Sequence, residues 1–179
     1  MSKNVLIISS TLRKNGNSEV LAREFAKGAQ ESGNNVEFIS LQDKEIKFCK
    51  GCLACQKLGS CVIKDDSNAI VEKMEKADVI AFASPIYYYE MSGQLKTLLD
   101  RGNPLFSSDY KFRDIYFLAT AADTDPHAAD IAANGIQGWV MCFEKAQLKG
   151  VILGAGAEAV GDIQNNPAMQ KAYDAGKGV

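Results

Sequence analysis

Short apolar runs alternate with amphipathic stretches along the whole chain. Five apolar runs have the length and composition of buried strands, at residues 5–8, 36–39, 79–83, 115–119 and 151–153. Apolar residues three or four apart predict helices at residues 18–32, 68–76, 93–101, around 136–143 and at 168–176. Strands that alternate with helices in this way predict an α/β fold with a doubly wound, five-stranded parallel sheet and helices on both faces.

Neither a linker, an internal repeat nor a low-complexity tract interrupts this pattern, so residues 1–179 are expected to form a single domain. The net charge is −2 and the pI is near 5.5, which gives no electrostatic footprint for nucleic acid or an anionic membrane. The first apolar run is too short for a signal peptide or a membrane span. We therefore expect a cytoplasmic protein that acts on small molecules or redox partners, with no membrane and no nucleic acid among its partners.

Four of the five cysteines lie within thirteen residues, at Cys49, Cys52, Cys55 and Cys61. In a reducing cytoplasm a disulfide framework is not expected, so the spacing CxxCxxCxxxxxC indicates redox chemistry or metal binding. Thiols at every third position of a tight loop can converge on one face of a cubane. A zinc site would more typically show two separated CxxC pairs, and free thiols in a structural loop are the other alternative. The fifth cysteine, Cys142, lies on an apolar helical face and is expected to be a buried core thiol.

The segment after the first predicted strand, residues 9–18 (SSTLRKNGNS), combines hydroxyls, two cations, amides and a helix start. Parallel α/β sheets bind ligands beyond the carboxyl ends of their strands. The unpaired N–H groups of a helix N-terminus face the same space as these side chains, so the segment predicts a phosphate cradle. The alternative is an ordinary turn in which Asn17 or Ser18 caps the helix.

Three consecutive tyrosines, Tyr87, Tyr88 and Tyr89, follow the third predicted strand and precede Met91. They cannot all face a core, and a loop stiffened by Pro85 offers flat walls on which a planar heterocycle could stack. One or two of the tyrosines could instead pack against a partner subunit. The two interpretations are compatible, and the apolar stretch predicts a homodimer or homotetramer.

Several short motifs occur together in one order: residues 13–18 (RKNGNS), the cysteine loop followed by Asp65 and Asp66, residues 84–87 (SPIY), residues 92–96 (SGQLK), residues 100–101 (DR) and residues 161–163 (GDI). In this combination the sequence resembles the NAD(P)H-dependent FMN reductase and iron-sulfur flavoprotein family of flavodoxin-like proteins. The resemblance spans nearly the whole chain. Relatives usually have Gly-Ser-Pro-Arg where this chain has residues 10–13 (STLR), which keeps a hydroxyl and the arginine.

The resemblance implies FMN as cofactor and assigns its contacts by position. The phosphate would be held by Ser10, Thr11, Arg13, Asn17 and Ser18. The isoalloxazine would be bordered by Pro85, Ile86, Tyr87 and Tyr88, and its pyrimidine edge approached by Thr120, Ala121, Ala122 and Asp123. The cysteine loop resembles the motif that ligates a [4Fe–4S] cluster, for which the ligands would be Cys49, Cys52, Cys55 and Cys61.

The implied function is an FMN-dependent oxidoreductase that takes electrons from NAD(P)H or from a reduced, ferredoxin-like carrier. The acceptor would be a small molecule such as a quinone, a flavin or a nitro or azo compound. Flavin chemistry needs no protein acid or base, so no catalytic side chain is expected. The alternative is a non-enzymatic, flavodoxin-like electron carrier, but Arg13, Lys14 and the mild net charge argue against one.

Overall fold

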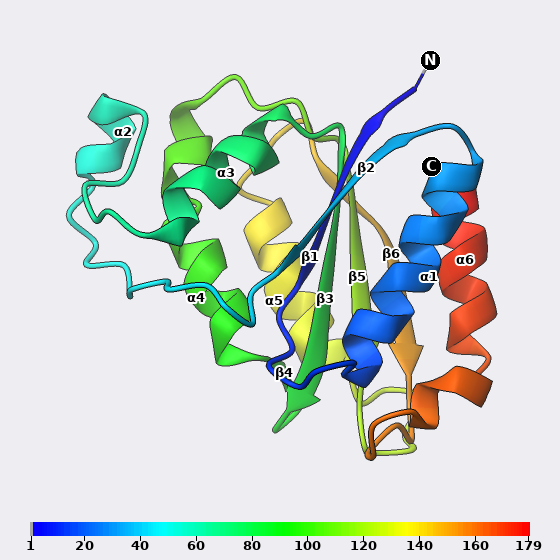
Figure 1. The fold of residues 1–179 in the computed structure, drawn as a ribbon. Coiled ribbons are helices and arrows are strands. Elements are labelled where there is room, and N and C mark those ends of the chain that lie inside the picture. The colour runs from blue at the N-terminus through cyan, green and yellow to red at the C-terminus, as the bar shows by residue number, and fades with distance from the viewer. Residues whose placement is uncertain (1) are drawn as a thin grey trace.

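The computed structural model describes residues 2–179 and contains a parallel sheet with helices on both faces (Figure 1). The strand order is β2-β1-β3-β5-β6, and β4 pairs antiparallel with the end of β3. The strands are β1 (Asn4–Ser9), β2 (Asn35–Ser40), β3 (Val79–Tyr87), β4 (Glu90–Met91), β5 (Asp114–Thr120) and β6 (Gln147–Gly154). The winding direction reverses between β1 and β3, where a doubly wound sheet leaves a crevice for ligands.

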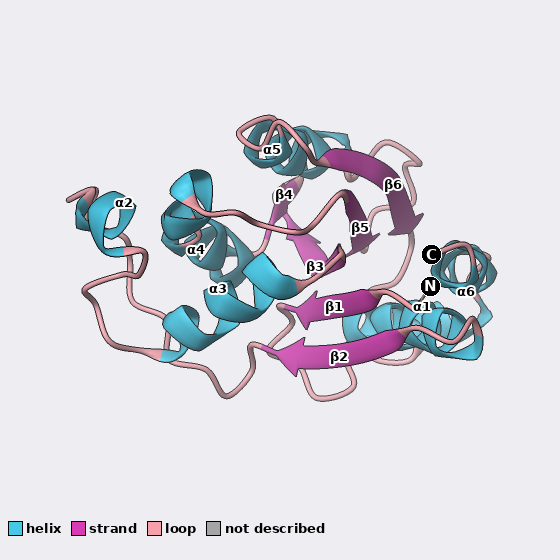
Figure 2. Cartoon of the chain, turned by 90° about the horizontal axis from the view of Figure 1, so that it is seen from above, coloured by secondary structure: helices cyan, strands magenta, loops and turns pink. Residues whose placement is uncertain are grey.

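Two groups of helices cover the sheet, as the view from above shows (Figure 2). One face packs against α1 (Asn17–Glu31) and α6 (Ala168–Lys177) and buries Phe25 and Leu118. The other packs against α3 (Asp66–Lys76), α4 (Gly93–Arg101) and α5 (Asp130–Val140), with Phe82 and Phe117 in its core. The sequence prediction of a doubly wound sheet with helices on both faces is therefore confirmed.

The five predicted strands are the five strands of the main sheet, and each predicted helix overlaps an observed one. Three details differ. The third strand continues through Pro85 to Tyr87, where the sequence predicts a loop. A short helix, α2 (Ala54–Leu58), lies inside the cysteine loop. Short 3₁₀ turns, η1 (Asn103–Ser107) and η2 (Asp162–Asn165), follow α4 and β6.

The expectation of a buried Cys142 is wrong. Helix α5 ends at Val140, and Cys142, two residues beyond it, is exposed. Phe143, next in the chain, takes the core position instead, at 4% exposure. Within residues 2–179, no helix is long and apolar enough to cross a membrane.

Candidate flavin site and cysteine loop

A cavity of about 210 Å³ lies beyond the carboxyl ends of β1, β3 and β5. Most of its lining comes from three segments that the sequence predicts as cofactor contacts. The lining residues are Thr11, Arg13, Asn17, Ser18, Pro85, Ile86, Tyr87, Thr120, Ala122, Ala157 and Glu158. The fold thus gathers at one edge of the sheet residues that are up to 147 positions apart in the sequence.

The start of α1 forms one end of this cavity. Its N-cap is Gly16, which provides no side-chain cap, so the alternative in which Asn17 or Ser18 caps the helix is wrong. A Cβ at Gly16 would come within 2.5 Å of Thr11 Oγ1, which explains the glycine at this close approach. The Oγ of Ser18 is buried and has no hydrogen-bond partner among the described residues. A buried hydroxyl without a partner beside a helix N-terminus fits the phosphate of FMN.

Asn17 and Arg13 have a role that the sequence did not reveal. The Asn17 amide donates to the carbonyl oxygens of Ala157 and Ala159, at 3.1 and 2.8 Å, and its oxygen accepts from the N–H of Gly161. Arg13 Nη1 donates to the Glu158 carbonyl oxygen at 3.0 Å. Both side chains therefore fix the segment after β6 against the cavity.

Ala157 and Glu158 reach the cavity through this contact and were missed in the sequence. The only indication in the sequence was the nearby GDI motif at residues 161–163. Its Gly161 has a left-handed backbone (φ 101°) and donates its N–H to Asn17 at the end of this segment. Nothing in the residue types of Ala157 and Glu158 themselves points to a ligand.

At the other end, Pro85, Ile86 and Tyr87 line the cavity, but Tyr88 does not. Tyr88 adopts a positive φ of 51° in the turn between β3 and β4, and 99% of it is exposed. Ser10 does not line the cavity either. Its buried Oγ donates to the carbonyl oxygen of Ala83 at 3.0 Å, which joins the loop after β1 to β3.

Of the four residues predicted after β5, Thr120 and Ala122 line the cavity. Ala121 is buried and donates its N–H to the Gly154 carbonyl oxygen, as part of the sheet edge. Asp123 accepts a hydrogen bond from the Tyr89 hydroxyl at 2.9 Å. The backbone N–H of Asp125, together with this hydroxyl, lowers the pKa of Asp123, and the same hydrogen bond raises the pKa of Tyr89. This pair joins the loops that follow β3 and β5.

The cysteine loop, residues 49–61, lies apart from the flavin cavity and contributes no residue to its lining. Cys55 is buried in α2, and its Sγ accepts a hydrogen bond from Asn103 Nδ2 at 3.0 Å. Cys61 is half-buried, whereas Cys49 and Cys52 are exposed. Across residues 2–179, no three Cys, His, Asp or Glu side chains lie close enough to hold a metal ion. In this conformation the four thiols do not form a closed cluster site.

A buried ion pair lies beneath this loop. Asp65 and Arg101 meet at 2.6 Å, and both side chains are fully buried. Burial alone would raise the pKa of Asp65, but the hydrogen bonds from Arg101, Lys47 and Ser67 outweigh it and hold this pKa far below its usual range. Asp65 also caps α3 by accepting the N–H of Ser67.

Comparison with known proteins identifies the family. Residues 3–144 match the NADPH-dependent FMN reductase family, so the chain belongs to it. The iron-sulfur flavoprotein MJ1083 of Methanocaldococcus jannaschii is 46% identical over 101 residues, which are 56% of this chain and 52% of that protein. In this and another such match, from Archaeoglobus fulgidus, the chain spans about half the length of the relative. The putative NAD(P)H-dependent FMN-containing oxidoreductase YwqN of Bacillus subtilis is 26% identical, over 94% of this chain and 93% of that protein.

Solved structures share the fold. An NAD(P)H:quinone oxidoreductase from Methanothermobacter marburgensis superposes with a TM-score of 0.73 at 17% identity, covering 99% of this chain and 96% of that one. An FMN-dependent NADH-azoreductase from Bacillus anthracis, solved in complex with FMN, has a TM-score of 0.66 at 13% identity and covers 98% of each chain. The family is named for the reduction of FMN, and the cavity described above has a helix N-terminus at one end and Pro85, Ile86 and Tyr87 at the other.

Proposed function

We propose that this protein transfers electrons from NAD(P)H, or from a reduced carrier, through FMN to a small acceptor such as a quinone, a flavin or a nitro or azo compound. One observation carries the proposal. A helix N-terminus with an unpartnered buried hydroxyl, Ser18, and an apolar wall from Pro85 to Tyr87 bound the same cavity. A phosphate and a flat ring are the two parts of FMN that such a cavity would hold.

When bound, FMN supplies the hydride and electron transfer itself. The chain's part is to bind and orient it. The N–H groups at the start of α1 and the Ser18 hydroxyl would hold the phosphate, and the cation of Arg13 lies at the same end. Pro85 and Ile86 would exclude water from one side of the ring. Flavin chemistry of this kind needs no side chain to move a proton, so no catalytic role is assigned to Asp123 or Glu158.

The test is a donor and acceptor screen on the purified protein. Yellow protein with flavin absorbance should oxidise NADH or NADPH, and adding a quinone or azo dye should accelerate that oxidation. A flavodoxin-like carrier would also be yellow but would not oxidise either nucleotide, and only a reduced protein carrier would reduce it. Colourless protein that takes up no added FMN would contradict both functions.

We also propose that the cysteine loop holds a [4Fe–4S] cluster, which the names of the iron-sulfur flavoprotein relatives support. Anaerobically purified protein should then contain about four iron and four sulfide per chain. Cys52→Ser should abolish both. Flavin content should be unchanged, because no residue of the loop lines the flavin cavity. Protein with flavin but no iron would show that the loop is structural or thiol-reactive.

The tyrosine turn supports self-association of the chain. Tyr88 is almost fully exposed, and Tyr87 and Tyr89 are half-exposed beside the flavin cavity. Met91, in contrast, is buried against α5 and belongs to the core of the same chain. Exposed aromatic side chains of this kind are typical of interfaces, so we propose a homodimer or homotetramer whose contact includes the turn.

Sedimentation equilibrium of the flavin-loaded protein should therefore give a mass at least twice that of the chain. Tyr88→Ser should shift the equilibrium toward monomer because it removes the most exposed ring of the turn. Met141→Ser is the matched control. It also removes an exposed apolar side chain, but Met141 follows the end of α5 that lies opposite to Ala132, whose N–H contacts the Tyr89 carbonyl oxygen of the turn. A monomer at micromolar concentration with flavin bound would contradict the proposal.

A further inference from the structure

The tyrosine turn, residues 87–90, is a two-residue hairpin whose backbone suits tyrosine poorly. Tyr87 pairs with Glu90 across β3 and β4, so Tyr88 and Tyr89 form the connection. Their φ angles are 51° and 65°. Hairpin turns with two positive φ angles favour asparagine and glycine, because the left-handed backbone is unfavourable for residues with a bulky side chain. The closed turn therefore depends on contacts from outside the hairpin.

Two such contacts reach Tyr89. Its backbone carbonyl oxygen accepts the N–H of Ala132, in α5, at 3.1 Å. Its hydroxyl donates to the carboxylate of Asp123, in the loop after β5, at 2.9 Å. Tyr88 is 99% exposed, so its own side chain adds no packing that would hold the turn. The side chain that secures the turn is thus that of Tyr89, and its partner is Asp123.

Asp123 is itself held in place by two further hydrogen bonds. Its other carboxylate oxygen accepts the N–H of Asp125 at 2.9 Å. Its backbone carbonyl oxygen accepts the N–H of Gly156, in the segment after β6, at 2.8 Å. Asp123 therefore joins three segments, at the carboxyl ends of β3, β5 and β6, and each of them contributes lining residues to the flavin cavity.

Neither Asp123 nor Tyr89 lines the flavin cavity. Their close neighbours do, because Tyr87 is two residues before Tyr89 and Ala122 is next to Asp123. A shift of the turn would therefore move Tyr87 relative to the cavity walls that follow β5 and β6. The carboxylate of Asp123 is engaged with Tyr89, so its influence on a ligand passes through these neighbours.

We infer that Asp123 is a positioning residue of the flavin site and that its hydrogen bond with Tyr89 is a latch. The latch holds the strained turn closed, and the closed turn sets Tyr87 against the bound flavin. This rests on the proposed FMN function, and it replaces the direct contact with the pyrimidine edge that the resemblance implies for Asp123. A ligand that binds only the closed turn loses apparent affinity in proportion to the closed fraction, so the latch sets the FMN affinity.

The first experiment measures FMN affinity by fluorescence titration of FMN-free protein. Tyr89→Phe and Asp123→Ala should each weaken FMN binding about threefold to tenfold, the range expected for one hydrogen bond. The double variant should bind no more weakly than Asp123→Ala, because both substitutions remove the same latch. Tyr173→Phe is the matched control. The Tyr173 hydroxyl also donates to a carboxylate, that of Glu31, but at the end of α1 that lies away from the flavin cavity.

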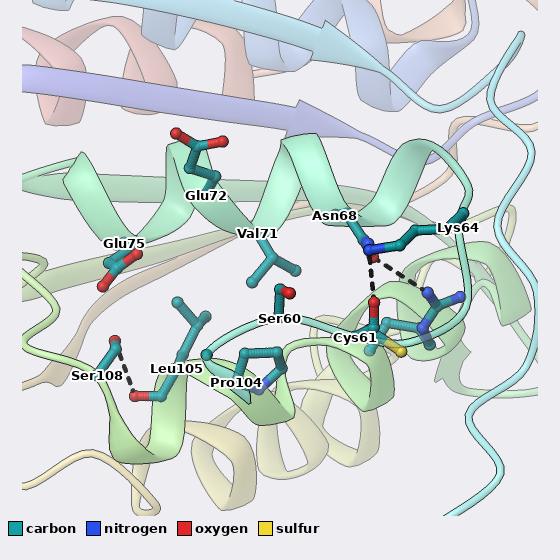
Figure 3. A pocket seen from close by; sticks show the side chains of 12 residues that line it. Ser60, Cys61, Lys64, Asn68, Val71, Glu72, Glu75, Pro104, Leu105 and Ser108 are labelled. Atoms are coloured by element: carbon teal, nitrogen blue, oxygen red, sulfur yellow. Dashed lines mark hydrogen bonds between the residues drawn. The ribbon is translucent and has the colours of Figure 1, made fainter. Parts of the chain in front are cut away.

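A second cavity offers a control for the general effect of losing a hydroxyl. This cavity, of about 330 Å³, shares no lining residue with the flavin cavity. On its wall the Ser108 hydroxyl donates to the Leu105 carbonyl oxygen at 3.2 Å (Figure 3). Ser108→Ala removes this hydrogen bond, and the FMN affinity should stay at the wild-type value.

The second experiment tests the strain in the turn. Asparagine tolerates a positive φ better than tyrosine, so Tyr88→Asn should favour the closed turn without the latch. Tyr89→Phe should then weaken FMN binding less than about twofold in the Tyr88→Asn background. The comparison is made within each background, so the direct effect of losing the Tyr88 ring cancels. Equal losses in the two backgrounds would show that the hydrogen bond does not work against backbone strain, which contradicts the latch.

Other results would also overturn the inference. Weaker FMN binding in Asp123→Ala but not in Tyr89→Phe would show that Asp123 contacts the flavin itself. Wild-type FMN affinity in both variants would show that the turn needs no latch. Both of these results leave the proposed function intact. Wild-type protein that takes up no FMN would reject the proposed function and the latch together.

Discussion

Asp65→Asn is expected to lower the free energy of unfolding by about 3–5 kcal/mol, because it leaves Arg101 buried without a counter-charge. The substitution also removes a carboxylate that accepts the N–H groups of Lys47 and Ser67. In a chain of this length the loss corresponds to a fall in melting temperature on the order of 10 °C. Urea denaturation at neutral pH measures it directly.

The pH dependence gives a second check. The pKa of Asp65 is lowered on folding, so the ion pair stabilises the protein above the unfolded value of 3.8 and this contribution is lost as the pH falls below it. The difference in free energy of unfolding between the wild-type protein and Asp65→Asn should therefore become smaller as the pH falls from 5 to 2. Asp66→Asn is the control, because the Asp66 carboxylate accepts a hydrogen bond only from the exposed backbone N–H of Glu45. This substitution should lower the free energy of unfolding by less than about 1 kcal/mol. If Asp65→Asn and Asp66→Asn lowered the free energy of unfolding equally, the stabilising role of the buried ion pair would be contradicted.

The sequence did not reveal this pair, and the reason is physical. Arg101 ends an amphipathic helix, where a basic residue usually points to solvent and complements the helix dipole. Its burial depends on the loop between β2 and α3, which folds back over α4 and supplies Asp65 from 36 positions away. The helical pattern of apolar residues describes one helix at a time. It therefore contains no information about which distant loop packs over that helix.

The sheet, by contrast, could be predicted because its central strands β1, β3 and β5 are buried on both faces and appear as continuous apolar runs. The extension of β3 was missed because a proline normally ends a central strand, and Pro85 lies in this one. Here Pro85 lies opposite Thr120 at the edge of the ladder, near the carboxyl end of both strands. The strand therefore delivers Ile86 and Tyr87 directly to the flavin cavity, where a loop was expected.

For the flavin site, the sequence predicted which loops meet but not what each side chain does there. Residue types identify donors such as Asn17, and only the fold shows that its amide is already satisfied by carbonyl oxygens 140 and 142 positions away. The unsatisfied donor is Ser18, which has the least distinctive side chain in the loop. Among the side chains of such a site, a buried polar group without a partner in the chain is the most informative one.

Ser18→Ala is accordingly expected to weaken FMN binding about tenfold to a hundredfold, the loss typical of a hydrogen bond to a charged group. Stability of the FMN-free protein should not fall, because the hydroxyl has no partner in the chain. Ser9→Ala is a matched control. Ser9 Oγ is also buried and unpartnered, but Ser9 does not line the flavin cavity, so its loss should leave FMN affinity unchanged.

Fluorescence titration of FMN-free protein gives the affinities, and thermal unfolding without FMN gives the stabilities. A Ser18→Ala variant that unfolds earlier without FMN would show that the hydroxyl has a structural partner. Equal FMN affinities for Ser18→Ala and wild type would place the phosphate elsewhere. Only reduced affinity at unchanged FMN-free stability, in Ser18→Ala and not in Ser9→Ala, assigns this hydroxyl to the phosphate.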